Sequence, residues 1–344
     1  MGSQRIGVVG AGVMGSEIAQ VAAAAGMAVT LRDVDAAALA RGLAHVRDIG
    51  ERRVARGRLD ADEAEAILAR ITPVEDDDAL ASCDLIVEAT TEVMDVKHQV
   101  FRRLDAVARA DALLATNTSG LSITRIARAT EHPERVLGLH FFNPASVMRL
   151  VEVIAGQDTT AEALQRGAEL VTAMGKTPVR VAECPGFLVN RVLIRALAEA
   201  YRFAAEEGAD RAAADAAVVE EGPAPMGPFA LGDLIGLDTL LHVQRDLEDA
   251  YGDRFAAGPE LADLVEQGHL GAKTGTGFLT DDRPDARADA LGRRVAERYY
   301  RGAVDEASRC VSEGVAAPDD TDLALTLGAG WEQGPLAWGQ GRAR

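Results

Sequence analysis

The chain contains few cysteines, and none of its hydrophobic runs is long enough to cross a membrane. The longest apolar run, at residues 21–28, is too short for a membrane span and includes a glycine. The three cysteines show neither the spacing of a metal site nor that of a disulfide framework: Cys83, Cys184 and Cys310. We therefore expect no membrane partner and no bound metal.

Basic charge is also scarce, because 54 acidic residues face 36 basic ones and the formal net charge is −18. Nucleic-acid binding needs a basic surface that neutralises phosphates, so this charge argues against a nucleic-acid partner. Nearly all of the basic residues are arginines, and only three are lysines: Lys97, Lys176 and Lys273. A lysine retained in such a composition indicates a position where a compact ammonium group matters.

The remaining composition is that of an ordinary globular protein, with 48% apolar and 26% charged residues. A length of 344 residues is enough for two domains, each with its own core. An apolar run that begins at Ile6 leads directly into a glycine-rich turn, which is not a signal-peptide pattern. We expect a cytoplasmic protein.

Short apolar runs alternate with helical stretches in the first half of the chain. The runs that we predict as strands are residues 5–10, 28–31, 85–89, 113–115, 136–139, 150–154 and 179–181. A strand, a helix and a strand in close succession form the unit that starts a parallel sheet. The sequence therefore predicts an α/β fold, a Rossmann-type doubly wound sheet over residues 1–184. A polar helical stretch at residues 35–71, interrupted near Gly57, predicts two helices that project from the sheet as a hairpin.

From residue 185 onward, long helical stretches rich in Ala and Glu replace the strand pattern. We predict an α-helical C-terminal domain at residues 185–280 and a second, partial helical repeat at 281–344, with a polar linker at 280–289. The repeat rests on features that recur 106 or 107 positions apart: Glu207-Gly208 with Glu313-Gly314, Asp215 with Asp322, Gly222 with Gly328, and Gly227-Pro228-Phe229 with Gly334-Pro335-Leu336. The second copy carries no candidate catalytic residue, which indicates packing rather than a second site.

A glycine-rich turn joins the first predicted strand to the helix after it. The turn matches the pattern G-x-G-x-x-G: Gly10-Ala11-Gly12-Val13-Met14-Gly15. Gly10 allows the tight turn, Gly12 lets a pyrophosphate approach the backbone, and Gly15 lets the helix pack against the strand. Asp33, at the end of the second strand, would accept hydrogen bonds from the adenosine ribose and repel a 2′-phosphate. The motif predicts a site for NAD rather than NADP, a preference that the neighbouring Arg32 weakens slightly.

A histidine and an acid flank a later turn of the chain. His140 follows the apolar run 136–139, at the sheet edge where open α/β sheets bind ligands, and Glu152 lies within the run 150–154. A carboxylate among apolar strand residues is costly without a partner, and a chain that folds back would place Glu152 beside His140. Alcohol oxidation needs such a pair, because the imidazole takes the hydroxyl proton and the carboxylate holds its tautomer. A hydrogen-bonded structural histidine is an equally good interpretation of the spacing alone.

Several further motifs have the order and spacing of one known family. They are Val87-Glu88-Ala89-Thr90-Thr91-Glu92, Thr116-Asn117-Thr118-Ser119, Leu139-His140-Phe141-Phe142-Asn143-Pro144, Leu150-Val151-Glu152-Val153, Gly175-Lys176-Thr177-Pro178-Val179, Pro185-Gly186-Phe187-Leu188-Val189-Asn190-Arg191, Pro225-Met226-Gly227-Pro228 and Lys273-Thr274-Gly275-Thr276-Gly277-Phe278. Over residues 5–280 the chain resembles the L-3-hydroxyacyl-CoA dehydrogenases, including the 3-hydroxybutyryl-CoA dehydrogenases. The resemblance implies NAD-dependent oxidation of the 3-hydroxyl group of an acyl-CoA.

The resemblance also implies roles for single residues. His140 would be the catalytic acid–base residue and Glu152 its partner, while Ser119 and Asn190 would orient the substrate oxygen. Five residues would line the NAD site beyond the glycine turn: Glu92, Lys97, Ser119, Asn143 and Lys273.

Without the resemblance, these positions have plainer interpretations. Ser119 and Asn190 are typical of helix caps and turns. Glu88 and Glu92 are typical of two solvated acids in one loop, and we expect a cofactor role only for Glu92.

Arginines cluster on the predicted helical hairpin. Six lie within eighteen residues: Arg41, Arg47, Arg52, Arg53, Arg56 and Arg58. Arginine suits phosphate groups, and in the family that the chain resembles this hairpin lies against the coenzyme A nucleotide. We expect Arg52, Arg53 and Arg56 to contact coenzyme A. Two alternatives stay open, a solvated face balanced by Asp48 and Glu51 and a docking surface for an acidic acyl carrier protein.

The C-terminal end departs from the family pattern. Leu279 replaces the tyrosine of a Gly-Phe-Tyr segment, and a helical stretch continues to Arg344. In the short relatives the helical domain forms a dimer interface, so we expect a homodimer unless the second copy fills that interface within one chain.

Two other functions compete with the oxidation of an acyl-CoA. One is a dehydrogenase that acts on a hydroxyacyl carrier protein, whose substrate arm is chemically the same. The other is a non-catalytic NAD-binding relative, against which four intact residues speak: His140, Glu152, Ser119 and Asn190.

Overall fold

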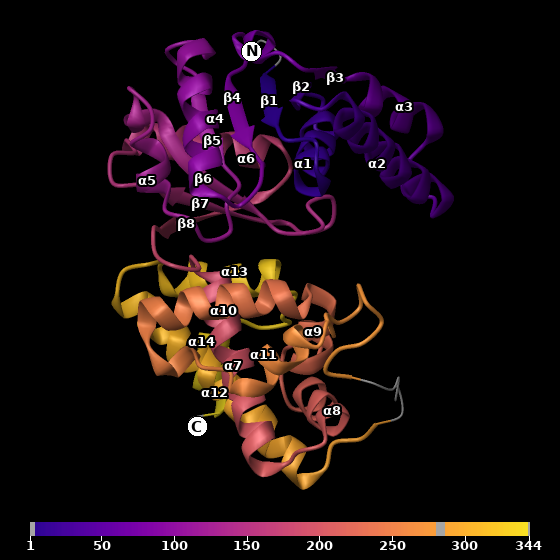
Figure 1. Cartoon of the computed structure of the whole chain (residues 1–344), viewed down its shortest axis with the longest axis vertical. Coiled ribbons are helices and arrows are strands. Elements are labelled where there is room, and N and C mark those ends of the chain that lie inside the picture. The colour runs from indigo at the N-terminus through magenta and orange to yellow at the C-terminus, as the bar shows by residue number, and fades with distance from the viewer. Residues whose placement is uncertain (1–3, 280–285, 343–344) are drawn as a thin grey trace. The chain divides into compact units, whose positions relative to one another are not determined.

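The computed structural model describes residues 4–279 and 286–342, which belong to two compact units, Met1–Glu183 and Cys184–Arg344. The first unit contains a sheet with flanking helices, and the second is built from helices (Figure 1). Of the predicted linker, residues 280–285 lie outside the described residues.

An eight-stranded sheet forms the centre of the first unit. Its strands, in spatial order, are β3 (Ile71–Val74), β2 (Ala28–Arg32), β1 (Arg5–Val9), β4 (Leu85–Glu88), β5 (Leu113–Thr116), β6 (Val136–Phe141), β7 (Leu150–Ala155) and β8 (Thr177–Ala182). Neighbouring strands are parallel except for β6 and β7, which pair antiparallel. The strand order reverses between β1 and β4, which is the switch point where such sheets bind dinucleotides. This topology confirms the predicted doubly wound α/β fold.

Helices cover both faces of this sheet. They are α1 (Val13–Ala24), α2 (Ala36–Ala55), α3 (Ala61–Ala69), α4 (Met94–Val107), α5 (Ile123–Ala127) and α6 (Ala161–Ala173), with short 3-10 turns η1 (Asp77–Leu80) and η2 (Pro133–Arg135). Along β4, Leu85 and Val87 enter the core under α1 and α6, whereas Ile86 enters the core under α4 and α5. Strands buried on both faces read as continuous apolar runs, which is why the sequence displayed them so clearly.

The edge strand β3 differs from the prediction, which continued the helical hairpin to residue 71. Its four residues include Pro73, and only Ile71 is fully buried. Proline is tolerated at a sheet edge because its missing N–H has no ladder partner to satisfy. So short and half-exposed a run has too little apolar alternation to be recognised in a sequence. The helices α2 and α3 pack together and extend beyond the β3 side of the sheet (Figure 1).

The second unit confirms the predicted α-helical C-terminal domain. Its helices are α7 (Val189–Glu207), α8 (Arg211–Glu221), α9 (Pro228–Ile235), α10 (Leu237–Tyr251), α11 (Pro259–Glu266), α12 (Ala290–Ser312), α13 (Pro318–Gly328) and α14 (Pro335–Arg342), with a 3-10 turn η3 (Asp253–Phe255) after α10. The central helix α7 is buried along most of its length, and α12 packs along both α7 and α8. In the described residues, no helix combines the length and the apolar content that a bilayer crossing requires.

One aspartate in each helical copy caps the helix that follows it. The Asp215 carboxylate, on α8, accepts hydrogen bonds from the first turn of α9, and the Asp322 carboxylate, on α13, accepts them from the first turn of α14. The four donors, at 2.8–2.9 Å, are the backbone nitrogens of Phe229, Ala230, Leu336 and Ala337. A Cβ at Gly227 or Gly334 would lie 2.3 or 2.2 Å from an atom of the capping aspartate, so only glycine fits before each capped helix. This shared local geometry explains why aspartate and glycine recur together in the sequence.

We predict that Asp322→Ala lowers the free energy of unfolding by about 1–2 kcal/mol, because two N–H groups at the start of α14 lose their acceptor. Urea denaturation followed by circular dichroism measures the change. The control is Asp305→Ala, which removes an exposed acid from α12 and should leave the stability nearly unchanged. Equal stabilities of the two variants would show that the cap contributes nothing to the second copy.

Candidate active site and cofactor site

The turn after β1 has the geometry that a dinucleotide pyrophosphate requires. Gly10 has a φ of +104°, and a Cβ there would lie 2.6 Å from the carbonyl oxygen of Ala89. A Cβ at Gly15 would lie 1.8 Å from the oxygen of Gly10, so only glycine lets α1 pack this close to β1. A Cβ at Gly12, in contrast, would meet no atom within 4 Å. The space at the N-terminus of α1, where backbone N–H groups attract phosphate, is therefore open to a ligand and fits NAD.

Asp33 lies at the end of β2 and is held next to the glycine turn. Its Oδ2 accepts a hydrogen bond from the Ala11 nitrogen at 2.7 Å, and its Oδ1 accepts one from the Asp35 nitrogen at 3.1 Å. The Arg32 guanidinium pairs with Asp77, with 2.7 Å between Nε and Oδ1. Because Asp77 already neutralises Arg32, this arginine offsets the Asp33 charge less than the sequence alone indicated.

The strands β6 and β7 place His140 beside Glu152. The two residues are direct partners in the antiparallel register, and Nδ1 of His140 lies 2.6 Å from Oε2 of Glu152. Their side chains are 6% and 0% exposed. The Phe142 ring lies 4.5 Å from the imidazole ring, between centroids. The structure thus brings together the two residues that we expected to meet, and it gives the carboxylate in an apolar strand its partner.

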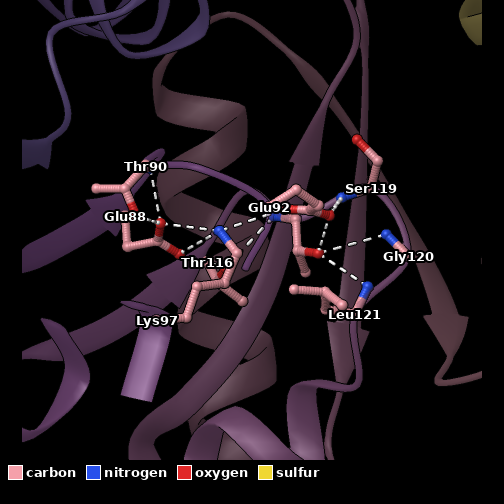
Figure 2. Close-up of polar contacts among 9 residues, drawn as sticks. Glu88, Thr90, Glu92, Lys97, Thr116, Ser119, Gly120 and Leu121 are labelled. Carbon is pink, nitrogen blue, oxygen red and sulfur yellow. Dashed lines mark hydrogen bonds and ion pairs between the residues drawn. The ribbon is translucent and has the colours of Figure 1, made fainter. Parts of the chain in front are cut away.

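Ser119 lies in the loop that follows β5, and Glu92 holds this loop. The Ser119 nitrogen donates to Oε1 of Glu92 at 2.8 Å, and the Thr118 hydroxyl donates to the same oxygen. The Thr118 oxygen in turn accepts hydrogen bonds from the nitrogens of Gly120 and Leu121 at 3.3 and 2.9 Å (Figure 2). The backbone around Ser119 therefore has a defined conformation set by one carboxylate.

A buried ion pair lies next to Glu92. The Nζ atom of Lys97 lies 2.9 and 3.0 Å from the two oxygens of Glu88 and 3.4 Å from Oε2 of Glu92 (Figure 2). The side chains of Lys97 and Glu88 are 1% and 0% exposed, whereas that of Glu92 is 39% exposed. Glu88 also accepts hydrogen bonds at 2.5–2.7 Å from the Thr90 nitrogen, the Thr90 hydroxyl and the Thr116 hydroxyl. The ammonium group therefore links a fully buried carboxylate to the exposed one that holds the Ser119 loop.

Our interpretation of Glu88 as a solvated acid is wrong, and it left a supporting residue out of the site. The signal was present in the sequence, because Glu88 directly follows the apolar run 85–87, just as Glu152 lies within an apolar strand. The rule that a buried carboxylate requires a partner applies equally to both. Thr116 and Thr118, by contrast, carry no such signal, since hydroxyl groups after a strand are common in turns.

Asn143 is an exposed residue of the loop between β6 and β7. Two contacts from other elements hold this loop. The Lys176 Nζ donates to two loop carbonyls, among them that of Ala145 at 2.5 Å. The Ser146 nitrogen donates to Oε2 of Glu17, a buried acid on α1, at 3.0 Å. The side chain of Asn143 is thus presented on a backbone that is anchored to α1.

The expected coenzyme A contacts lie where α2 ends. Arg52 and Arg53 are in the last turn of α2, and Arg56 follows it directly. Arg52 and Arg56 are exposed, and Arg53 is half-buried. Among residues 4–279 and 286–342, none of the ion pairs involves these three arginines, Asp48 or Glu51. Exposed arginines that are not engaged in close ion pairs are suited to phosphate.

Two expected site residues belong to the second unit. Asn190 lies in the first turn of α7. Lys273, which is 44% exposed, forms an ion pair with Asp238 of α10, which is 42% exposed. The carboxylate of Asp238 partly neutralises the positive charge of Lys273.

Two family models match the chain, one to each of its two units. The family described as 3-hydroxyacyl-CoA dehydrogenase, NAD binding domain, matches residues 5–184, and the corresponding C-terminal domain matches residues 186–281. A 3-hydroxyadipyl-CoA dehydrogenase of Escherichia coli (strain K12) is 41% identical over 327 residues, which are 94% of this chain and 68% of that protein. A 3-hydroxybutyryl-CoA dehydrogenase of Clostridioides difficile is 42% identical over 276 residues, which are 80% of this chain and 98% of that protein.

A solved structure resembles the chain almost from end to end. The crystal structure of 3-hydroxybutyryl-CoA dehydrogenase from Escherichia coli K12 has a TM-score of 0.90 at 32% identity, and the match covers 99% of this chain and 92% of that one. This match and the 94% coverage of the hydroxyadipyl enzyme extend past the C-terminal family domain, so both relatives share the second helical copy. These relatives are all named as dehydrogenases, which argues against the alternative of a non-catalytic NAD-binding protein. The chain belongs to the 3-hydroxyacyl-CoA dehydrogenase family and is an NAD-dependent oxidoreductase.

Proposed function

We propose that this enzyme interconverts (S)-3-hydroxyacyl-CoA and 3-oxoacyl-CoA, with His140 as the acid–base residue and Glu152 as its partner. The observation that carries the proposal is the buried imidazole–carboxylate pair, with 2.6 Å between Nδ1 and Oε2. It lies near the carboxyl end of β6, in line with the carboxyl ends of β4 and β5. Open α/β sheets bind their ligands at this edge.

The pair is suited to proton transfer in both directions. Bound NAD supplies the hydride acceptor for the substrate carbon. Because Nδ1 of His140 faces Glu152, Nε2 is the nitrogen that takes the proton of the 3-hydroxyl group. The carboxylate favours the cationic imidazole that results and keeps its ring in one orientation. In the reverse direction Nε2 returns the proton to the carbonyl oxygen, so the same residues support a reversible reaction.

We assign Ser119 and Asn190 to orienting the substrate oxygen. Their hydroxyl and amide groups are donors of the kind that stabilise a carbonyl or alkoxide oxygen. Support for Ser119 comes from the loop in which it lies, because Glu92 accepts hydrogen bonds from the Ser119 nitrogen and from the Thr118 hydroxyl. Asn190 has the support of its place in the first turn of a buried helix.

We assign the NAD site to two groups of residues. The glycine turn would hold the pyrophosphate and Asp33 the adenosine ribose: Gly10, Ala11, Gly12, Val13, Met14, Gly15 and Asp33. Glu92, Ser119, Asn143 and Lys273 would contact the nicotinamide half. Lys97, which is 1% exposed, would act on the cofactor mainly through Glu92.

The substrate carrier is assigned to coenzyme A, with Arg52, Arg53 and Arg56 as phosphate contacts. The names of the relatives, a 3-hydroxyadipyl-CoA and a 3-hydroxybutyryl-CoA dehydrogenase, support this assignment. The same exposed arginines also favour an acidic acyl carrier protein. Turnover of acetoacetyl-CoA with NADH supports the first assignment, and turnover of the carrier-bound substrate alone supports the second.

We also propose that the protein forms a homodimer. Measurement of its molecular mass in solution tests this proposal.

We predict that His140→Gln lowers kcat about 10³-fold, because general acid–base catalysis of this kind contributes about that factor. Reduction of acetoacetyl-CoA followed by NADH absorbance measures it. Binding of NADH, measured by fluorescence, should stay within twofold of the wild type. The control is His242→Gln, which replaces an exposed histidine of α10. Near-normal turnover in His140→Gln removes this residue from the mechanism.

We predict that Asp33→Asn weakens NAD binding about tenfold and narrows the preference for NAD over NADP, because the ribose loses a charged acceptor and a 2′-phosphate is no longer repelled. Dissociation constants of NADH and NADPH measure both effects. The control is Asp35→Asn, two positions later, because asparagine caps α2 as well as aspartate does. An unchanged preference would mean that another residue reads the ribose.

We predict that Glu88→Gln and Lys97→Met each lower the free energy of unfolding by about 3 kcal/mol, because each leaves a buried charge without its main partner. The double variant should be more stable than either single variant, since it buries neither charge. Urea denaturation of all four proteins measures the coupling. Additive losses in the double variant would show that the pair is not coupled.

A further inference from the structure

Four charged side chains meet at the start of α7, next to Asn190. Arg191 is 0% exposed, and its Nε lies 2.8 Å from Oε1 of Glu306, an equally buried residue of α12. Its Nη1 lies 2.7 Å from Oε2 of Glu313, which follows α12. Arg254, in η3, places its Nε 3.0 Å from the second oxygen of Glu306. Two cations and two carboxylates balance one another, as buried charges require.

The charges of this cluster are divided between the two helical copies. Arg191 and Arg254 belong to the first copy, and Glu306 and Glu313 belong to the second. The helix α12 lies along α7 within the second unit (Figure 1). Without the second copy, Arg191 would lose both of the carboxylates that pair with it, Glu306 and Glu313.

At the offset that aligns the Glu-Gly ends of α7 and α12, the acid at Glu306 has no acidic counterpart in the first copy. At the offset of 106 positions that relates Glu207-Gly208 to Glu313-Gly314, Glu306 corresponds to Ala200. At the same offset Arg191 corresponds to Glu297. One copy thus carries the buried cation and the other carries the anion that neutralises it. The two copies are complementary where they touch.

Tyr251 connects this cluster to the chain that leads into α7. Two guanidinium groups contact its ring: the centroid lies 4.2 Å from Cζ of Arg191 and 4.9 Å from Cζ of Arg254. Cations over an aromatic face are attracted by the ring quadrupole. The Tyr251 hydroxyl donates to the carbonyl oxygen of Pro185 at 3.3 Å. Tyr251 therefore links the Arg191 side chain to the backbone at Pro185.

The turn between Pro185 and α7 needs such support. Phe187 has a φ of +49°, a conformation that residues with side chains adopt only when their surroundings hold them there. The backbone nitrogen of Arg191 donates to the oxygen of Gly186 at 3.2 Å and so closes the turn. Asn190 lies between the turn and the anchored side chain of Arg191.

The electrostatics of the cluster agree with this geometry. Burial alone would lower the pKa of Arg191, but its contacts with Glu313 and Glu306 raise it above the usual value. The contact with Arg191 lowers the pKa of Glu313. Both groups therefore carry their charges at neutral pH.

We propose that Glu306 is a positioning residue for the substrate end of α7: through Arg191 it holds the first helical turn in the conformation that presents Asn190. The second helical copy then contributes to the reaction by supplying this carboxylate, in addition to packing. The inference rests on the proposed role of Asn190 in orienting the substrate.

The test is Glu306→Gln, which keeps the size of the side chain and removes its charge. Reduction of acetoacetyl-CoA by NADH gives kcat and KM, and fluorescence titration gives the dissociation constant of NADH. We expect kcat/KM for acetoacetyl-CoA to fall about tenfold, while the NADH dissociation constant stays within twofold. The matched control is Asp305→Asn, the neighbouring acid on the exposed side of α12, which should behave as the wild type.

Coupling to Asn190 separates positioning from a general loss of structure. In an Asn190→Ala background, Glu306→Gln should lower kcat/KM by less than a further twofold, because its effect passes through the side chain already removed. An equal tenfold loss in both backgrounds overturns the proposal. If Glu306→Gln fails to fold, the pair Glu306→Gln with Arg254→Gln removes one charge of each sign, and the same losses are expected of it.

The outcomes distinguish this inference from the proposed function. A loss of turnover in Asn190→Ala together with normal turnover in folded Glu306→Gln overturns the role of Glu306 alone. Normal turnover in Asn190→Ala removes Asn190 from the mechanism and with it the route by which Glu306 would act. The assignment of His140 would be unaffected by either result.

Discussion

The proposed active site depends on one hydrogen bond, which joins His140 on β6 to Glu152 on β7. It requires that the chain turn back after β6, so that two residues twelve positions apart become direct partners in an antiparallel ladder. The otherwise parallel sheet contains one antiparallel junction, and the pair is placed there. Because both side chains are nearly inaccessible to water, the carboxylate interacts strongly with the imidazole and has no better partner in solvent. The proposed proton transfer follows from this arrangement.

Three fully buried carboxylates in the molecule each pair with a basic side chain. Glu88 receives the ammonium group of Lys97, Glu152 faces His140, and Glu306 receives the guanidinium group of Arg191. Each of the three is 0% exposed. A buried ion pair adds little net stability compared with apolar packing, but it strongly disfavours any conformation that separates the charges. Such pairs therefore define the positions of the elements from which the proposed site residues project, which apolar contacts specify less sharply.

The repeat in the second unit combines a contact that both copies share with a surface at which they differ. Asp215 and Asp322 make the same capping contact in both copies, so this part of the repeat is a local solution that works independently of its neighbours. The surface between the copies has diverged, since Arg191 and Glu306 occupy positions that are not equivalent in the repeat. The two helical copies thus meet through complementary charges. The matches to two of the similar proteins extend over the second copy.

The sequence by itself predicted the features that depend on neighbours along the chain. These are the strands of the doubly wound sheet, the glycine turn with Asp33, the helical repeat, and the contact of His140 with Glu152 across a short loop. Its errors arose where partners are remote. The edge strand β3 was missed because only pairing with β2 defines it, and Glu88 was taken for a solvated acid because its partners Lys97 and Thr116 come from other elements. The contact between Arg191 and Glu306 spans 115 positions and could not be read from either residue. A charged group needs a partner only where it is buried, and burial is a property of the packed chain. Only the tertiary structure therefore shows which charged residues are paired and with which partners.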